Sequence, residues 1–374
     1  MAASTPKLLG PIRVGNLDLA HRVVLAPLTR FRANAAHVHG DLAVIYYAQR
    51  ASKPGSLLIT EATFIAAEAG GMNNVPGIWS KDQIKAWKRV TDAVHQNQSF
   101  IYLQLWALGR QADAEVLKRE GNYPYVSSSN VPMKRKKTTP RPLTKEEIAK
   151  YVGLYATAAS NAIEAGFDGC EIHGANGYLI DQFIQDVTNT RTDEYGGSIE
   201  NRARFALEVT QAVTNAIGQE RTGIRLSPWS EFGDMREKEP IPTFSYVIQQ
   251  LHDRFPSLAY LHLIEPRIMG DQAVTATDDA SQEDSNAFAR SIWGERPLIV
   301  AGGFNPQTAK DTVESEGGLV AFGRWYISNP DLPKRIEHGA ELHPYDRKTF
   351  YKTESPDGYI DYPFLEEEAA KGKL

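Results

Sequence analysis

The chain has 374 residues, a formal net charge of -5 and a single cysteine, Cys170. Hydrophobic residues make up 42% of it and charged residues 23%, a balance typical of globular proteins. Nucleic-acid-binding proteins are usually basic, so the charge disfavours that class. A single cysteine excludes an intrachain disulfide, and no apolar run reaches the length of about 18 residues that a membrane span needs. The first ten residues lack the apolar segment of a signal peptide, so we expect a cytoplasmic protein.

Short apolar runs alternate with amphipathic stretches along most of the chain. The runs are rich in valine, isoleucine, leucine and aromatic residues, and they show no strict alternation with polar residues. This pattern is typical of strands that are buried on both faces, as in a parallel sheet covered by helices. Eight runs are expected to be strands: Arg22–Leu28, Leu57–Ile65, Phe100–Trp106, Gly169–His173, Gly223–Ser227, Tyr260–Glu265, Pro297–Gly302 and Leu319–Gly323.

Capping residues mark the starts of helices between these runs. Ser80 precedes a helix expected over Lys81–Asn97, and Thr144 opens another as part of a capping box. Ser198 is the expected cap of a third helix, whose apolar residues repeat on one face over Asn201–Ile217. Eight strands in a strand–helix rhythm predict the α/β class and a closed (β/α)8 TIM barrel.

We expect one (β/α)8 barrel domain spanning residues 1–374. Several stretches of the sequence are additional to its strand–helix repeats. Residues 8–21 are expected to form an N-terminal hairpin that plugs the barrel floor. Excursions follow strands 3, 4 and 6. The first, residues 111–142, contains a basic run that we interpret as a solvated loop, with a contact for an anionic cofactor as the alternative; the last, residues 268–284, is acidic. The tail, residues 345–374, is expected to pack its first aromatic residues over the barrel mouth and to fray near its end.

The most informative polar cluster, His173-Gly174-Ala175-Asn176-Gly177-Tyr178, directly follows the fourth expected strand. The active face of a barrel lies at the C-terminal ends of its strands. His173 and Asn176 can both donate to one carbonyl oxygen, which would stabilise an enolate as it forms. Tyr178 offers a proton donor that is neutral beforehand. A structural turn at a capped strand end is the alternative interpretation.

Glycines and arginines at the ends of the last two strands favour a phosphate site. Gly302-Gly303 ends strand seven, and Gly323-Arg324 ends strand eight. Backbone N–H groups at glycines can approach a phosphate closely, although tight strand–helix turns also explain them. Arg225 interrupts strand five, where a buried charge is costly unless it is paired. We favour an anionic ligand edge over a salt bridge to a core carboxylate. The sequence holds no cysteine–histidine constellation that predicts a metal site.

Taken together, these motifs resemble the Old Yellow Enzyme family of FMN-dependent ene-reductases over about Leu8 to Tyr351. The segments that carry the resemblance are Ala26-Pro27-Leu28-Thr29-Arg30, Glu61-Ala62-Thr63, Gln104-Leu105-Trp106, the His173 cluster, Asn189 to Ser198, and Gly323-Arg324 with Ile327-Ser328-Asn329-Pro330. Thr29 and the histidine–asparagine pair are similar to the classical, yeast and fungal branch. The block Arg191–Asn201 is expected to be structural and ion-paired.

The resemblance implies FMN as the cofactor and NADPH, or NADH, as the hydride donor. The residues that it implies for cofactor binding are Pro27, Leu28, Thr29, Ala62, Gln104, Arg225, Gly302, Gly303, Gly323 and Arg324. Those that it implies for substrate binding are His173, Asn176, Trp106 and Tyr351. Tyr178, His173 and Asn176 would be catalytic, with Tyr178 as the proton donor.

By this resemblance the chain is an NADPH dehydrogenase that acts on activated alkenes and also binds phenolic ligands. Hydride would pass from the nicotinamide to flavin N5 and then to the β-carbon of an α,β-unsaturated carbonyl compound, with ping-pong kinetics. The expected assembly is a monomer or homodimer. Two alternatives stay open: a flavin-free barrel that acts as a lyase or isomerase on a phosphorylated substrate, and a biosynthetic isomerase or binder built on the same flavin barrel.

Overall fold

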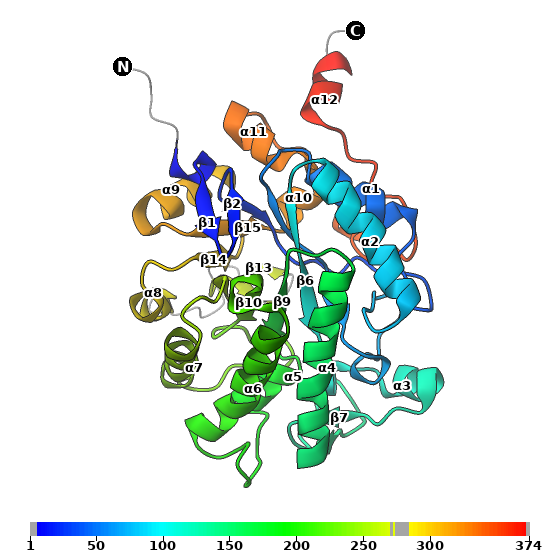
Figure 1. The fold of residues 1–374 in the computed structure, drawn as a ribbon, viewed down its shortest axis with the longest axis vertical. Helices are drawn as coiled ribbons and strands as arrows, with labels where there is room; N and C mark the ends of the chain where they lie inside the picture. Colours follow the sequence, from blue (N-terminus) through cyan, green and yellow to red (C-terminus); the bar gives the residue numbers. More distant parts are fainter. Residues whose placement is uncertain (1–5, 270–271, 274–283, 372–374) are drawn as a thin grey trace.

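Eight parallel strands form the centre of the molecule and close on one another (Figure 1). The computed structural model describes residues 6–269, 272–273 and 284–371. Around the closed sheet the strands are β3 (Val23–Leu25), β4 (Leu57–Ile59), β6 (Phe100–Trp106), β9 (Gly169–Gly174), β10 (Thr222–Leu226), β11 (Tyr260–Ile264), β14 (Leu298–Ala301) and β15 (Leu319–Phe322). Pairing of β4 with both β3 and β6 completes the ring. The predicted (β/α)8 barrel is confirmed.

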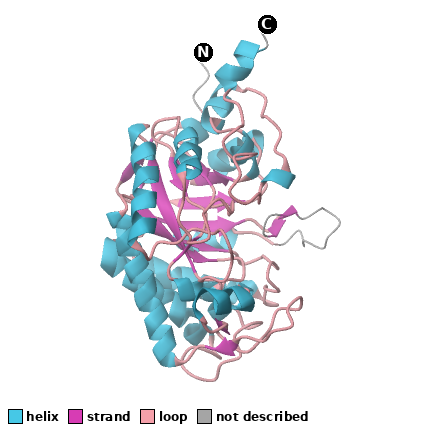
Figure 2. Cartoon of the chain, turned by 90° about the vertical axis from the view of Figure 1, so that its right-hand side faces the viewer, coloured by secondary structure: helices cyan, strands magenta, loops and turns pink. Residues whose placement is uncertain are grey.

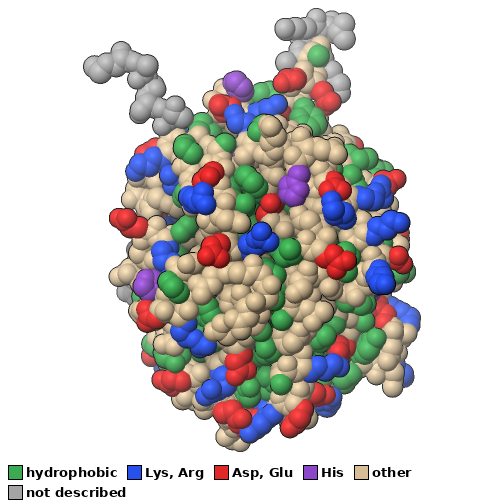
Figure 3. Space-filling model, in the orientation of Figure 1, with side chains coloured by type: hydrophobic (Ala, Val, Ile, Leu, Met, Phe, Trp, Pro, Cys, Tyr) green, Lys and Arg blue, Asp and Glu red, His purple; other side chains and the backbone are tan. Residues whose placement is uncertain are grey.

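A layer of helices surrounds the strands (Figures 1 and 2). The helices that follow successive barrel strands are α1 (Asp41–Arg50), α2 (Lys81–Gln96), α4 (Lys145–Glu164), α6 (Ile199–Ile217), α7 (Pro240–Arg254), α8 (Ala287–Trp293), α9 (Pro306–Glu316) and α10 (Arg324–Ser328). The expected caps at Ser80, Thr144 and Ser198 each accept a backbone hydrogen bond. No described helix is long and apolar enough to cross a membrane. On the face drawn in Figure 3, positive and negative side chains are interspersed.

The N-terminal hairpin closes the floor of the barrel, as predicted. It consists of β1 (Ile12–Val14) and β2 (Leu17–Leu19). Gly15 has φ 55° in the turn, and an added Cβ would lie 2.0 Å from the carbonyl oxygen of Glu220. Leu17 and Leu19 are buried in one apolar cluster with the inward-facing side chains of the barrel strands. The hairpin therefore removes the lower end of the barrel from water.

The expected single strand over Leu57–Ile65 is wrong, because the chain bulges there. Ile59, the last residue of β4, pairs with Tyr102. The second segment, β5 (Thr63–Phe64), pairs its first residue with Leu105. From Ile59 to Thr63 the chain advances by four residues, while its partner strand β6 advances by three, from Tyr102 to Leu105. One extra residue on one strand is the pattern of a β-bulge. The bulge bends the chain at the active end of the barrel.

The excursion after β6 has more regular structure than the sequence suggested. It contains a 3-10 turn, η3 (Gly109–Gln111), a helix, α3 (Ala114–Gly121), and a short parallel pair, β7 (Val126–Ser127) with β8 (Arg141–Pro142). Within the basic run, the ammonium group of Lys136 donates to the carbonyl oxygens of Gln111 and Ala112. The flanking Lys134, Arg135 and Lys137 are exposed. Three of the four cations are therefore solvated, and Lys136 fastens the loop.

The excursion after β9 begins with α5 (Leu179–Ile184) and continues into the block that we expected to be ion-paired. Arg191 pairs with Asp193 at 2.6 Å. Glu194 pairs with Lys145, at the start of α4, also at 2.6 Å. The expected ion pairing of this block is confirmed.

The described parts of the last two segments reach the C-terminal end of the barrel, where Ile268, Phe350 and Tyr351 line one cavity. Residues 268–284 begin with the antiparallel pair β12 (Ile268–Met269) and β13 (Gln272–Ala273), and most of the expected acidic loop lies outside the described residues. The tail contains η5 (Arg347–Thr349) and α12 (Leu365–Lys371). The expected fraying is wrong for the described part of α12, because Glu368 of that helix bonds to the buried Arg335 at 2.7 Å.

Candidate active site

A cavity of about 360 Å³ opens at the C-terminal ends of the barrel strands, on the side where loops gather in Figure 2. Ligand pockets commonly have volumes of about 300–1,000 Å³. The predicted site residues that line the cavity are Pro27, Leu28, Thr29, Asn176, Tyr178, Arg225, Gly302, Gly303, Gly323, Arg324 and Tyr351. Segments from both ends of the chain and from its middle therefore meet at one site. In the described residues, no group of histidine, cysteine and carboxylate side chains is arranged to hold a metal.

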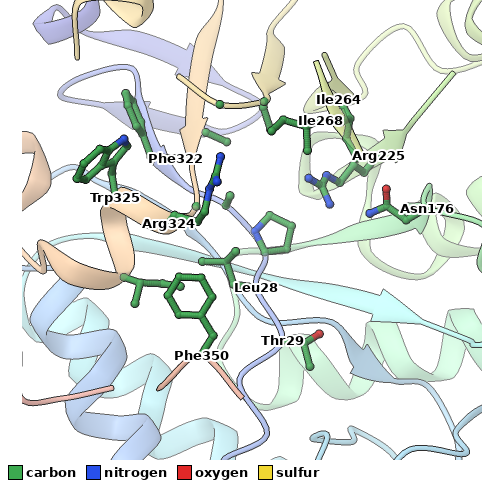
Figure 4. A pocket seen from close by; sticks show the side chains of 18 of the residues that line it. Leu28, Thr29, Asn176, Arg225, Ile264, Ile268, Phe322, Arg324, Trp325 and Phe350 are labelled. Carbon is green, nitrogen blue, oxygen red and sulfur yellow. The ribbon is translucent and has the colours of Figure 1, made fainter. Parts of the chain in front are cut away.

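The side chains of Arg225 and Arg324 approach the cavity from different sides, and Asn176 lies beside Arg225 (Figure 4). Arg225 is buried, and its Nε atom has no hydrogen-bond partner among the residues that the structure describes. Burial lowers the pKa of Arg225, while the nearby carboxylate of Glu171 acts in the opposite direction. A guanidinium remains charged under these conditions. An unpaired buried cation at a cavity wall favours an anionic or strongly accepting ligand edge.

At the end of the cavity away from Arg225, the wall is formed by the backbone of glycine residues and by the side chain of Arg324. Gly303 is exposed and has φ 62°, and an added Cβ there would be in ordinary van der Waals contact with Ile268, at 3.5 Å. Arg324 is the first residue of α10, after Gly323. The first N–H groups of a helix have no partner within the helix. These features suit a phosphate group, as the sequence predicted.

The turn after β9 holds Asn176 in a left-handed conformation, with φ 56°. Its N–H donates to the hydroxyl of Ser227 at 2.7 Å, and its carbonyl oxygen accepts from the amide of Gln111 at 2.6 Å. Within the described part of the chain, the buried side-chain oxygen of Asn176 has no hydrogen-bond partner. The backbone of this residue is therefore fixed, whereas its side-chain amide is free to meet a ligand.

Tyr178 lines the cavity with its ring held by two neighbours. Its ring meets those of Trp106 and His173 edge to face, with centroid distances of 4.7 Å and 5.0 Å. Burial raises the pKa of Tyr178, so the phenol keeps its proton at neutral pH. A neutral phenol at a cavity wall can donate a proton to a bound molecule.

His173 is buried and neutral. Burial is the main cause that holds its pKa well below the usual value, and the positive charges of Arg225 and His262 act in the same direction. The N–H of Ala175 donates to His173 Nδ1 at 3.4 Å, which assigns the ring proton to Nε2. His173 is therefore a hydrogen-bond donor through Nε2 without being a cation.

Four predicted residues are absent from the described cavity wall: Ala62, Gln104, Trp106 and His173. Ala62 and Trp106 belong to the apolar cluster on which Tyr178 packs. The amide nitrogen of Gln104 donates to a carboxylate oxygen of Glu171 at 2.7 Å. These residues thus surround or support the cavity wall.

Sequence reasoning missed a buried acid and base inside the barrel. Glu171 accepts from Nδ1 of His262 at 2.8 Å, and both side chains are completely buried. Burial alone would raise the pKa of Glu171, but His262, Arg225 and Gln104 together lower it. The sequence did hold a signal for Glu171, because side chains alternate between the two faces of a strand. Glu171 lies two residues before His173 and therefore faces the barrel interior with it.

The sequence model of the NADH:flavin oxidoreductase / NADH oxidase family matches residues 7–343. The chain is 52% identical over 365 residues to "Chanoclavine-I aldehyde reductase fgaOx3" of Penicillium roqueforti (strain FM164), covering 96% of this chain and 97% of that protein. It is 47% identical over 378 residues to "Probable inactive reductase easA" of Epichloe festucae var. lolii, covering 99% and 98% of the two chains. The chain is thus similar over nearly its whole length both to a relative named as a reductase and to one named as a probable inactive reductase.

Solved structures show the same likeness in three dimensions. The Old Yellow Enzyme of Pichia sp. AKU4542 superimposes with a TM-score of 0.87 at 38% identity, covering 96% of this chain and 94% of that one. Morphinone reductase, solved in complex with tetrahydroNAD, gives a TM-score of 0.86 at 39% identity, with coverages of 96% and 98%. The chain therefore belongs to the NADH:flavin oxidoreductase / NADH oxidase family and is a flavin-dependent oxidoreductase of the Old Yellow Enzyme type.

Proposed function

We propose that this protein is an FMN-dependent ene-reductase, which uses NADPH or NADH to reduce the C=C bond of α,β-unsaturated carbonyl compounds. One observation carries the proposal: a single cavity combines a buried guanidinium, a phosphate-type end, and a turn that presents the Asn176 amide and the neutral Tyr178 phenol, with the His173 ring packed against that phenol. The first two features suit a flavin mononucleotide, and the third suits an activated alkene.

The chain fits FMN at both ends of the cavity. Gly303, Gly323 and Arg324 would hold the phosphate, since exposed backbone and a guanidinium are good phosphate partners. Arg225 would face the part of the ring system on which negative charge gathers, and Thr29 would offer a hydroxyl to a ring oxygen. When bound, FMN supplies the hydride chemistry, while the protein supplies orientation and electrostatics.

His173, Asn176 and Tyr178 would act on the alkene. Nε2–H of His173 and the side-chain amide of Asn176 would donate to the substrate's carbonyl oxygen, which draws electron density away from the C=C bond. Tyr178 would deliver its phenolic proton to the α-carbon. Because burial raises the pKa of Tyr178, this proton is held until the reaction creates a strong base.

The names of the relatives refine the substrate class. Two relatives, from Penicillium roqueforti and Cladobotryum sp., are named aldehyde reductases, at 52% and 46% identity. We therefore include unsaturated aldehydes with enones among the substrates, and phenols among the ligands, because a phenolate oxygen can occupy the same donor pair. Trp106 and Tyr351 would contact the substrate beyond its carbonyl group.

An inactive flavin binder is the second candidate, since relatives at 46–47% identity are named probable inactive enzymes. The presence of Tyr178 at the cavity wall favours the reductase. Turnover distinguishes the two candidates, because a binder would take up phenols without consuming NADPH in the presence of an enone.

The visible spectrum of the purified protein tests the proposal. We expect a flavin band that bleaches when NADPH is added without oxygen and returns when 2-cyclohexenone follows. A band that bleaches but does not return with an enone or enal would favour the binder. A colourless protein that takes up no added FMN would refute the proposal and favour a barrel for a phosphorylated substrate.

A further inference from the structure

The residue before Tyr178 is held from two sides by side chains of α5. The N–H of Gly177 donates to Oδ2 of Asp181 at 2.7 Å, and its carbonyl oxygen accepts from the amide of Gln182 at 2.7 Å. Asp181 is completely buried. Gly177 has φ 68°, and an added Cβ would lie 2.5 Å from a side-chain carbon of Met235. The turn that presents Tyr178 is therefore fixed by hydrogen bonds and by close packing.

Asp181 also connects this turn to another loop. Its second oxygen, Oδ1, accepts from the amide nitrogen of Gln185 at 2.8 Å. Oε1 of Gln185 then accepts from the backbone N–H groups of Arg236 and Glu237, at 2.8 Å and 3.1 Å. These residues end the loop after β10, which also contributes Phe232 to the cavity wall. A continuous chain of hydrogen bonds thus joins the turn after β9 to the loop after the neighbouring strand, β10.

The donors and acceptors along this series of hydrogen bonds allow only one orientation of the Gln185 amide. Gly177 offers a donor at one end, and the two backbone N–H groups offer donors at the other. The backbone N–H groups of the loop can only donate, so Gln185 must turn its oxygen to the loop and its nitrogen to Asp181. Burial raises the pKa of Asp181 to about 7, and the hydrogen bonds from Gln185 and Gly177 act in the opposite direction, in favour of the carboxylate. If the Gln185 amide were reversed, its nitrogen would face the N–H groups of Arg236 and Glu237, and these donors would have no acceptor. The loop is held from elsewhere too, because Arg110 donates to the carbonyl oxygens of Gly233 and Asp234.

We propose that Asp181 and Gln185 are positioning residues for the proton-transfer step, because they fix the Tyr178 turn relative to the loop after β10. The inference rests on the proposed function and deepens it. Neither residue touches the cavity wall. Their effect is confined to the half-reaction in which the alkene is protonated, since hydride uptake from NADPH does not require the phenol.

Single substitutions and their combination test this relay. Both substitutions disrupt the hydrogen bond between residues 181 and 185. In Asp181→Asn the introduced amide nitrogen faces the amide nitrogen of Gln185, so that two donors meet. In Gln185→Glu the introduced carboxylate faces the carboxylate of Asp181, so that two acceptors meet. Each single variant is expected to slow alkene reduction by about tenfold, the scale of one lost buried hydrogen bond, with NADPH-driven bleaching unchanged. Together the two substitutions reverse the polarity: the new asparagine accepts from Gly177 and donates to the new glutamate, which accepts from the loop. The double variant is therefore expected to recover most of the rate.

Rapid-mixing measurements of the two half-reactions, with melting temperature and flavin content, separate positioning from stability. Asp331→Asn is the matched control: Asp331 is buried, bonds to Arg335 four residues later in α11 (Leu332–His338), and is absent from the cavity wall. We expect this variant to lower the melting temperature and to leave both rates unchanged. Gln185→Met, which cuts the link to the loop but spares Asp181, replaces Asp181→Asn if that variant does not fold.

An unchanged alkene step in the single variants would overturn the relay, and so would a double variant no faster than the slower single one. Equal loss in both half-reactions would also overturn it, because it would indicate general damage to the fold. A wild-type protein that binds no FMN or reduces no enone would instead refute the proposed function. The two failures are therefore distinguishable.

Discussion

Tyr178 keeps its phenolic proton because its ring is packed against Trp106 and His173 and partly removed from water. Substitution to phenylalanine preserves this packing and removes only the hydroxyl group. We expect Tyr178→Phe to slow enone reduction about a hundredfold or more, the usual scale of general acid catalysis. NADPH oxidation with oxygen as acceptor should be spared. Stopped-flow absorbance of the flavin in each half-reaction measures both, and unchanged enone turnover would exclude Tyr178 as the donor.

His173 contributes a neutral donor whose proton is fixed on Nε2 by the N–H of Ala175. By the proposed function, His173→Ala would remove one of the two donors to the substrate carbonyl. A donor of this kind contributes about 3 kcal/mol, roughly a hundredfold in rate. We expect kcat/KM for 2-cyclohexenone to fall by that factor and titration with a phenol to show weaker binding. Wild-type phenol affinity would contradict the assigned role.

At the scale of elements, α4 begins with a capping box that also carries an ion pair. Glu147 accepts from the N–H of Thr144 at 2.9 Å and from both terminal nitrogens of Arg141 at 2.6 Å and 2.7 Å. The hydrogen bond to Arg141 is the main cause that lowers the pKa of Glu147 to about 2. A depressed pKa stabilises the fold above the unfolded-state pKa of about 4.3 and ceases to do so as pH falls toward 2.

This linkage predicts a pH-dependent effect of Glu147→Gln. The variant should be less stable than wild type at pH 7, and the difference should shrink steadily below pH 4.3. Urea unfolding followed by circular dichroism at several pH values measures it. Because the pair is partly exposed, salt should also reduce the difference. A difference that is constant with pH would show that the ion pair does not stabilise α4.

At the scale of the whole molecule, the N-terminal hairpin is expected to support the barrel from below. Leu19 is 1% exposed among side chains of the barrel interior. Leu19→Ala should therefore cost about 2–5 kcal/mol of unfolding free energy, the range for large-to-small changes in a core. Val187→Ala is the control, because that side chain is 39% exposed and should change stability by less than about 0.5 kcal/mol. Equal stability of the two variants would mean that the floor packs loosely.

Much of the candidate site was predictable because its signals are local. The cluster from His173 to Tyr178 occupies six consecutive residues after one strand, and the glycines near Arg324 end another. Strand ends of a barrel meet on one face, so a correct strand assignment brings such residues together. The caps at Ser80 and Thr144 were predictable for the same reason, since a cap needs only three or four neighbouring residues.

Other features depended on contacts that no local pattern encodes. The bulge between β4 and β5 exists because β6 sets the register of both, and one extra residue must then protrude. The pair of Glu171 and His262 joins residues that are 91 positions apart. Their meeting depends on the order and inward face of the strands after the barrel closes.

The sequence by itself determined the fold class, the helix starts and the residue types available at the barrel mouth, because hydrophobic periodicity and capping act over a few residues. Only the tertiary structure decided which of those residues face the cavity and which support it from behind. Asp181 shows the difference: nothing in its neighbourhood along the chain predicts that it fixes Gly177 and also holds Gln185, whose partner Arg236 lies 51 residues farther along the chain. Closing the barrel fixes the distances between strands, and those distances decide which polar groups find partners.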